Sequence, residues 1–287
     1  MKHLSTLLIF AILTICSCTK ESSNDPIVTT NDSITLIKYV DLDTTQIVGL
    51  DTLVVNKITY DNSKRLKESN TTEYSSGIPN KLFQNILFYN GVDTLPFKKT
   101  QTISDLPSGT VTGTSIGYYN YSNNKLVSDS AIYYYNTTTY YSRHYSYESD
   151  KIIETTYIYY SSVPTITTRS IYLTKNNGNT ILQKDTVIGF YTHNFSFQYD
   201  NKNNPFYGRP QAFVDRSLPY YDMETFSEEM AYEKNNPTEI NEFENSYNFH
   251  FKYLYEYKPN GYPSVARVYD QNDPLNFFKR IFIYTKL

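Results

Sequence analysis

Short runs of hydrophobic and β-branched residues alternate with polar clusters along most of the chain, and the clusters recur at regular intervals. Between positions 121 and 257 the successive intervals are 26, 26, 26, 33 and 25 residues. Asn, Asp and Gly favour tight turns, because they tolerate positive φ and their side chains can satisfy local backbone groups. The pattern therefore predicts a chain of hairpins, with clusters YDNSKRL at 60, YSNNKLV at 121, YESDKII at 147, LTKNNGNTI at 173, YDNKNNPF at 199, YEKNNPTEI at 232 and YKPNGYP at 257.

The stretch from Tyr140 to Tyr159 shows what one such hairpin would contain. A turn over residues 148–151 pairs Tyr147 with Ile152, Tyr145 with Glu154 and Arg143 with Thr156. Neither face of this hairpin is a clean apolar stripe, so the alternation expected of a sheet with one buried side is blurred. One face holds Tyr141, Arg143, Tyr145, Tyr147, Ile152, Glu154, Thr156 and Ile158, and the other holds Tyr140, Ser142, His144, Ser146, Ile153, Thr155, Tyr157 and Tyr159.

Two strands and two turns fit into one repeat of about 26 residues, which predicts strands of roughly ten residues. We therefore expect an all-β fold, a long antiparallel meander of about twelve to sixteen strands whose sheet is curved or partly closed. The pattern leaves three shapes open for this sheet: a large barrel-like closure, a sandwich or an elongated curved sheet. Exposed sheet edges would offer a surface to a partner. Residues 90–114 and 204–230 interrupt the repeat and are expected to be irregular, with one short helix near 222–230 (Asp222 to Met230).

The N-terminus indicates export. Lys2 and His3 precede an apolar run from Leu7 to Ile15, which is too short for a permanent transmembrane helix. The following Cys-Ser-Cys resembles a bacterial lipobox, which implies that Cys18 is acylated and becomes the first residue of the mature protein. Acylation of Cys16 would place Ile15 where a small residue is required, and an ordinary secreted protein with a stray thiol is the other alternative. We thus expect a signal peptide at 1–17, a lipidated flexible tether at 18–33 and a single repetitive β domain at 34–287.

Composition supports the all-β prediction and excludes some partners. The chain has 31 Tyr and 16 Phe but no Trp, and Tyr favours strands. A formal net charge of −3 gives no indication of nucleic-acid binding. The two cysteines are both in the N-terminal segment, so the mature β domain has no thiol for a disulfide or a thiolate metal site.

The repeats also resemble a known group. The segments FQYDNKNNPF, YEKNNPTEI and YEYKPNGYPSVARVY are similar to the tyrosine-aspartate (YD) repeats of lipoproteins in Bacteroidota, which are distantly similar to Rhs-type proteins. The resemblance covers residues 115–287 well and 34–114 loosely. It implies an all-β, lipid-anchored envelope protein, and it carries over no catalytic residue, because the motif consists of turn-forming residues.

Few residues are candidates for chemistry, and we expect no catalytic, cofactor or metal site. His144, His193 and His250 each stand alone on an expected strand. The pairs Asp41 with Asp43 and Asp270 with Asp273 could offer oxygen ligands to calcium, but turn chemistry explains them better. A glycosidase needs two carboxylates, and its first candidates would lie in the second irregular segment, at Glu224, Glu228 and Glu229.

The sequence thus favours a non-enzymatic, lipid-anchored envelope protein with a repetitive sheet that acts as a scaffold or binding surface. The alternative is a glycan-acting enzyme or a sugar-binding accessory lipoprotein, although the absence of Trp counts against a dedicated carbohydrate site. The expected partners are the membrane through the lipid anchor, and an envelope protein or a glycan. The expected location is the outer membrane, on its periplasmic side or at the cell surface, and Lys20-Glu21 resembles the export signal of surface lipoproteins.

Overall fold

The computed structural model describes residues 34–44, 51–134, 138–159, 164–174, 178–189, 191–207, 233–244, 247–272 and 277–286. These ranges form sixteen strands and contain no helix. The strands are β1 Ile34–Asp43, β2 Asp51–Tyr60, β3 Leu66–Ser75, β4 Ile78–Phe88, β5 Lys98–Asp105, β6 Val111–Ser122, β7 Lys125–Tyr134, β8 Thr138–Tyr147, β9 Lys151–Tyr159, β10 Pro164–Thr174, β11 Thr180–Val187, β12 Tyr191–Asn203, β13 Asn235–Glu244, β14 Tyr247–Tyr257, β15 Pro263–Asp270 and β16 Phe277–Lys286.

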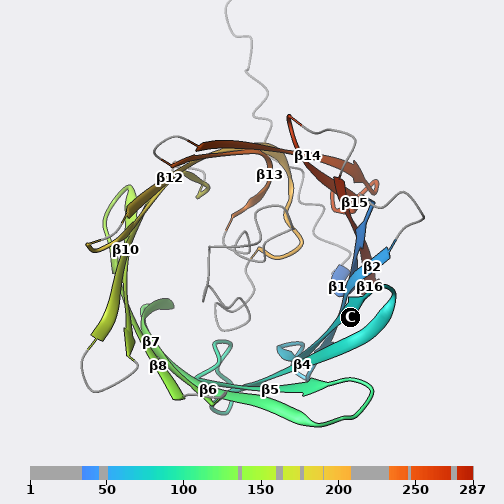
Figure 1. The fold of residues 1–287 in the computed structure, drawn as a ribbon, viewed down its shortest axis with the longest axis horizontal. Coiled ribbons are helices and arrows are strands. Elements are labelled where there is room, and N and C mark those ends of the chain that lie inside the picture. The colour runs from blue at the N-terminus through green and yellow to red at the C-terminus, as the bar shows by residue number, and fades with distance from the viewer. Residues whose placement is uncertain are drawn as a thin grey trace, which may run out of the picture.

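The strands form one closed antiparallel barrel in which each strand pairs with its neighbours in sequence (Figure 1). The antiparallel meander and the strand number were predicted correctly. The sheet is curved as predicted, but the prediction of partial closure was wrong, because β1 pairs with β16 from Ile34–Lys286 to Asp43–Phe278. Closure removes the free edges, so the sheet edges expected to receive a partner do not exist in this barrel.

The two irregular segments have different outcomes. Residues 90–114 are more regular than expected, because β5 and the start of β6 lie within them and pair antiparallel. The segment 204–230 does leave the ladder after Asn203, and the described part of it turns at residues 205–207. The helix expected at Asp222 to Met230 lies outside the described residues.

The hairpin at residues 140–159 has the predicted register. Tyr147 pairs with Ile152, Tyr145 with Glu154 and Arg143 with Thr156. Its turn is closed by the amide of Glu148, which donates to the carbonyl of Lys151 at 2.9 Å. Local turn chemistry therefore fixes the register here.

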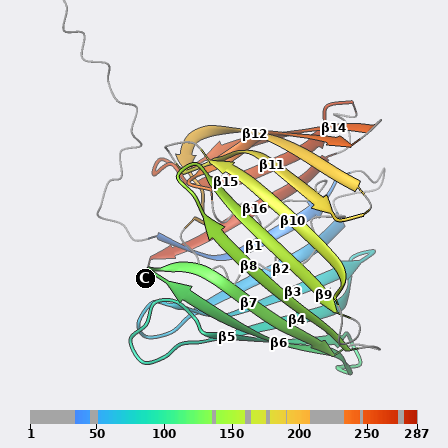
Figure 2. The same cartoon turned by 90° about the vertical axis from the view of Figure 1, so that its left-hand side faces the viewer.

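The repeated turns gather at one end of the barrel, because one repeat spans two strands. We call this end the repeat end; its turns include residues 61–65, 123–124, 148–150 and 258–262. In the turn at 123–124, Asn123 and Asn124 have φ of 51° and 60°, as a two-residue hairpin turn requires. The start of β1 and the C-terminus lie at the same end (Figure 2).

The tyrosine of the repeat has a definite structural role. At the repeat end, the hydroxyl of Tyr147 in β8 donates to the carbonyl of Leu126 in β7 at 2.8 Å. Among the described residues the same bond forms at three further places, from the repeat tyrosine Tyr60 and from Tyr89 and Tyr284, which lie outside the repeated clusters. Each bond closes the open end of a hairpin. The equivalent pairs are Tyr60 to Leu36 at 2.8 Å, Tyr89 to Leu66 at 2.6 Å and Tyr284 to Pro263 at 2.8 Å.

A cation from the preceding turn covers the ring of three of these tyrosines. Lys125 lies 4.8 Å from the ring centre of Tyr147, and Lys258 lies 5.0 Å from that of Tyr284. Arg65 lies 4.5 Å from the ring of Tyr89. Each turn thus supplies a cation and a nearby carbonyl to the tyrosine of the next repeat, which links consecutive repeats.

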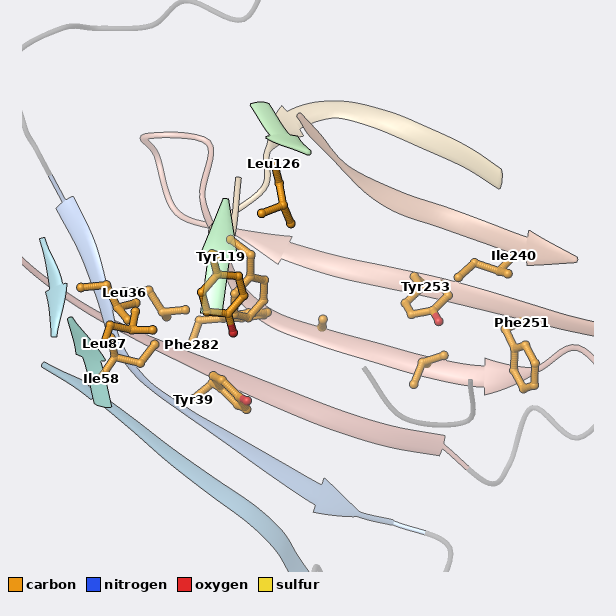
Figure 3. Close-up of a cluster of buried hydrophobic side chains, with 14 residues drawn as sticks. Leu36, Tyr39, Ile58, Leu87, Tyr119, Leu126, Ile240, Phe251, Tyr253 and Phe282 are labelled. Carbon is orange, nitrogen blue, oxygen red and sulfur yellow. The ribbon is translucent and has the colours of Figure 1, made fainter. Parts of the chain in front are cut away.

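The covered face of the sheet is the inner one. Buried residues and most of the exposed hydrophobic residues of the strands lie on opposite faces, and in the described residues nothing covers the outer wall of the ring. The buried face is therefore inward, and the amber chain after β12 turns into the ring (Figure 1). Figure 3 shows the inner hydrophobic cluster, which includes Leu36, Tyr39, Ile58, Leu87, Tyr119, Leu126, Ile240, Phe251, Tyr253 and Phe282.

Candidate functional site

The inner wall carries buried ion pairs as well as aromatic rings. At the seam between β1 and β16, the guanidinium of Arg280 donates to both carboxylate oxygens of Asp41 at 2.6 and 2.7 Å. The same guanidinium lies 4.1 Å from the ring centre of Tyr39 and 5.7 Å from that of Phe206. Both partners are largely buried, at 3% and 6% exposure, so this pair fixes the register of the strands that close the barrel.

A second buried pair lies on β7 and β8. The Arg143 guanidinium donates from Nε to Asp129 at 3.0 Å, and its Nη2 makes a further short contact with the same carboxylate. Glu154, on β9, contributes to the electrostatic environment of Arg143 and is 5% exposed. Burial opposes the charged form of Arg143, but the negative groups around it raise the pKa of its guanidinium above the ordinary value.

A polar network holds the two ends of the segment between β12 and β13. Asn204 donates from its side chain to the carbonyl of Glu233 at 2.8 Å, and the Glu233 carboxylate accepts the amide of Thr180 at 2.6 Å. Asn179 donates to the side chain of Asn235 at 3.0 Å. These side chains are buried, so the segment leaves and rejoins the barrel wall at one defined place.

Two tyrosines belong to the same network. Burial raises the pKa of Tyr199, whose hydroxyl also interacts with Glu233. Burial likewise raises the pKa of Tyr257, whose hydroxyl donates to Asp200 in a short contact. Both side chains therefore stay protonated well above neutral pH, as donors to carboxylates must.

The three histidines lie in separate places. His193 is on the inner wall of β12, where Nδ1 lies 2.9 Å from Oε1 of Glu242. His144 faces outward on β8, with Nε2 3.2 Å from the hydroxyl oxygen of Ser142. His250 faces outward on β14, with Nε2 3.6 Å from Glu239.

The acidic pairs considered for calcium have other roles. The Asp41 carboxylate accepts hydrogen bonds from Arg280, and Asp43 lies two residues further along the inner face of β1. Asp270 accepts the backbone amide of Asn272 at 2.8 Å, which is turn chemistry. Asp273 lies outside the described residues. The same holds for Cys18 and for the candidate glycosidase carboxylates Glu224, Glu228 and Glu229. Within the described ranges no group of three or more His, Cys, Asp or Glu side chains could hold a metal ion.

The outer wall is largely polar. The strand registers place basic and acidic side chains outward on several strands, including Lys57 on β2, Glu239 on β13 and Lys252 on β14. On β6 to β9 the outward residues are instead hydroxyl-bearing and aromatic, among them Tyr134 and Tyr140. The sequence predicted which residues of the 140–159 hairpin share a face, but it did not show which face is outward.

No family model and no curated protein matches the chain. Among solved structures, it is similar to a porin-like protein from Bacteroides uniformis ATCC 8492, with a TM-score of 0.50 and 10% sequence identity over 87% of this chain and 98% of that one. It is also similar to a porin-like protein from Bacteroides vulgatus ATCC 8482, with a TM-score of 0.47 and 12% identity over 88% and 99% of the two chains. At such identities the likeness to the first of these shows a shared fold alone.

The residues that organise the inner wall had weak signals in the sequence. Arg280 and Asp41 are 239 positions apart, and neither lies in a repeated cluster. His193 was considered as an isolated residue, and its partner Glu242 is 49 positions away. A charged residue within an otherwise apolar or aromatic strand face was the only available indication of a buried pair. The described part of the chain contains no helix that is long and apolar enough to cross a membrane.

Proposed function

We propose that the protein is a lipid-anchored envelope protein whose closed barrel is surrounded by solvent, not by lipid, and serves as a non-catalytic binding scaffold. The anchor is the acylated Cys18, and residues 19–33 connect it to the start of β1 at the repeat end. The proposal rests on the expected signal peptide and on the resemblance of the repeats to YD-repeat lipoproteins. The observation that carries it is the charge on the outer wall.

A transmembrane pore is the competing function, because barrels of this strand number also occur as porins. The wall of such a pore faces lipid through an apolar band about 25 Å tall. In this barrel Lys57, Arg169, Lys184, Lys252 and Arg267 lie on the outward face near the middle of their strands. The outward wall therefore has charged side chains where a pore has apolar ones.

The energetic cost of inserting this wall into a bilayer is large. One Lys or Arg on a lipid-facing position at the bilayer midplane costs about 2–4 kcal/mol. The five basic residues together would cost roughly 10–20 kcal/mol, which is of the same order as the folding free energy of about 5–15 kcal/mol of a typical domain. Pairing does not remove the problem, because the ion pair of Arg267 with Glu256, at 2.8 Å, is itself exposed on this wall. The outer wall therefore has a lower free energy in water than against acyl chains.

Cell fractionation tests the proposal. We would compare the natural chain, Cys18→Ala, the control Cys16→Ala, and residues 19–287 exported behind a cleavable secretory signal. We expect labelled palmitate in the natural chain and in Cys16→Ala, and none in Cys18→Ala. The lipid-free form should be recovered without detergent, with the circular dichroism of a β protein.

Recovery of the lipid-free form in the membrane fraction, extractable only with detergent, would show that the barrel inserts, and it would refute the proposal. Protease treatment of intact cells then distinguishes the two locations. Digestion in intact cells supports surface display, and protection that is lost on permeabilising the outer membrane supports the periplasmic side. A scaffold role predicts that purified protein is free of hydrolase activity on envelope glycans.

A further inference from the structure

One quadrant of the outer wall differs from the rest. In the stretches Thr112–Asn120, Ser128–Tyr134, Thr138–Ser146 and Ile153–Tyr159, every outward residue is uncharged. The charged residues of these stretches, Asp129, Arg143 and Glu154, all point inward. Four neighbouring strands, β6 to β9, therefore present a wall without formal charge.

Aromatic rings form a continuous row on this quadrant. The ring centres of Tyr140 and Tyr159 are 5.2 Å apart, those of Tyr159 and Tyr157 are 6.5 Å apart, and those of Tyr157 and His144 are 6.0 Å apart. We call these four residues the tyrosine strip. The hydroxyl of Ser142 lies beside it, 3.2 Å from Nε2 of His144.

The quadrant is open to solvent in the part of the protein that the structure describes. Tyr140 is 38% exposed, and the neighbouring Tyr134 and Tyr118 are 44% and 48% exposed. Ile116 and Ile132 pair on the same outward face, between these tyrosines. Exposed rings in such a group are typical of binding surfaces.

The geometry of the barrel excludes several occupants. A peptide cannot add to the sheet as an extra strand, because the closed barrel has no free edge. A second rigid barrel would bring its own convex wall against this one, which limits the contact area below that of two complementary surfaces. The lack of cationic groups excludes nucleic acids and acidic glycans, which need Lys or Arg partners.

The remaining chemistry is that of a neutral, flexible chain with apolar ring faces and hydroxyl edges. We infer that the tyrosine strip binds a neutral polysaccharide. The C–H faces of successive sugar rings stack on Tyr140, Tyr159 and Tyr157, while the sugar hydroxyls bond to Ser142, Thr155 and the tyrosine hydroxyls. A flexible chain can follow the convex wall from ring to ring.

This inference rests on the proposed function, since a wall embedded in lipid could not meet a polysaccharide. It names a ligand class for the scaffold. The chain has no Trp, and a convex wall buries little of each sugar, so each contact is weak. Binding strength must come from several rings acting together on a polymer, so long chains bind and short oligosaccharides do not.

Native affinity electrophoresis tests the inference on the full mature protein in a mild detergent. The gels contain amylopectin, galactomannan or arabinoxylan as neutral probes, and polygalacturonate as the acidic control. We expect at least one neutral polysaccharide to retard the protein, and polygalacturonate to leave its mobility unchanged. The double variant Tyr140→Ser with Tyr159→Ser should lose at least about tenfold in affinity.

The matched control is Phe243→Ser with Leu254→Ser, which removes two exposed apolar side chains from the charged wall, at 45% and 53% exposure, and should bind normally. Ser142→Lys places a charge within the quadrant at a surface position, so it should abolish binding without affecting folding. Retention by none of the neutral probes, or equal retention of the strip variants and the control, overturns the inference. Because the fractionation experiment does not involve glycans, a barrel that stays soluble but fails to bind contradicts only this inference.

Discussion

The bond between Tyr147 and Leu126 allows a quantitative test of the repeat. Tyr147→Phe removes one hydroxyl, which donates to the carbonyl of Leu126 at 2.8 Å, and keeps the ring under Lys125. A neutral hydrogen bond contributes about 0.5–1.5 kcal/mol. Since Leu126 is only 3% exposed, water has little access to its surroundings, and we expect a loss of about 1–1.5 kcal/mol in the free energy of unfolding.

Urea unfolding of the mature protein, followed by circular dichroism, measures this loss as a lower midpoint at unchanged slope. The control is Tyr134→Phe, which removes a hydroxyl from the exposed outer wall and should change stability by less than about 0.5 kcal/mol. If the two variants have equal stability, the hydroxyl bond does not hold the hairpin closed, and our explanation of the tyrosine at this position of the repeat is wrong. Adding Lys125→Gln to Tyr147→Leu should cost nothing further, because the ring that the cation covers is already gone.

Three further changes have definite expected results. Asp41→Asn should destabilise the barrel by about 3–5 kcal/mol, because it leaves the buried Arg280 without its counter-charge, and Asp41→Leu with Arg280→Met should restore much of the loss in the same urea assay. Asn124→Ala should cost about 1–2 kcal/mol, because φ is 60° there, whereas Asn124→Gly should be close to neutral in thermal unfolding. Burial raises the pKa of Tyr89 from 10.0 to about 12. The protonated side chain therefore contributes its full stabilisation below pH 10, and this contribution is lost as the pH rises through 12. Absorbance at 295 nm should show such tyrosines ionising together with unfolding.

The sequence predicted the parts of the fold that depend on neighbouring residues. Turn chemistry placed the hairpin of β8 and β9 in its correct register, because Glu148 to Lys151 leave few ways to reverse the chain. Closure of the barrel could not be predicted in this way. It depends on β1 meeting β16, with Asp41 opposite Arg280, and no local pattern encodes a pairing across 239 positions.

The same limit applies to the candidate surface. The sequence assigned Tyr140, His144, Tyr157 and Tyr159 to one face of a hairpin, and the structure brings their rings together as a row. The opposite face of the same hairpin contains the same number of tyrosines, so the tyrosine content of a face did not distinguish the outer wall from the inner one. The charged residues indicate better which face points inward. A buried Arg143 needs a counter-charge, and Asp129 on the neighbouring strand β7 supplies it.

Tyrosine can occupy both walls of this barrel because its two ends have different chemistry. On the inner wall its ring supplies apolar area while its hydroxyl satisfies a backbone carbonyl at the strand end, as Tyr89 does for Leu66 at 2.6 Å. On the outer wall the same side chain exposes a ring edge and keeps its hydroxyl in water, as the 38% exposure of Tyr140 shows. Phenylalanine would leave inner carbonyls unsatisfied, and serine would leave the interior underpacked. A repeat rich in tyrosine thus specifies a closed barrel without a strictly alternating hydrophobic pattern, which is why that alternation is blurred in the sequence.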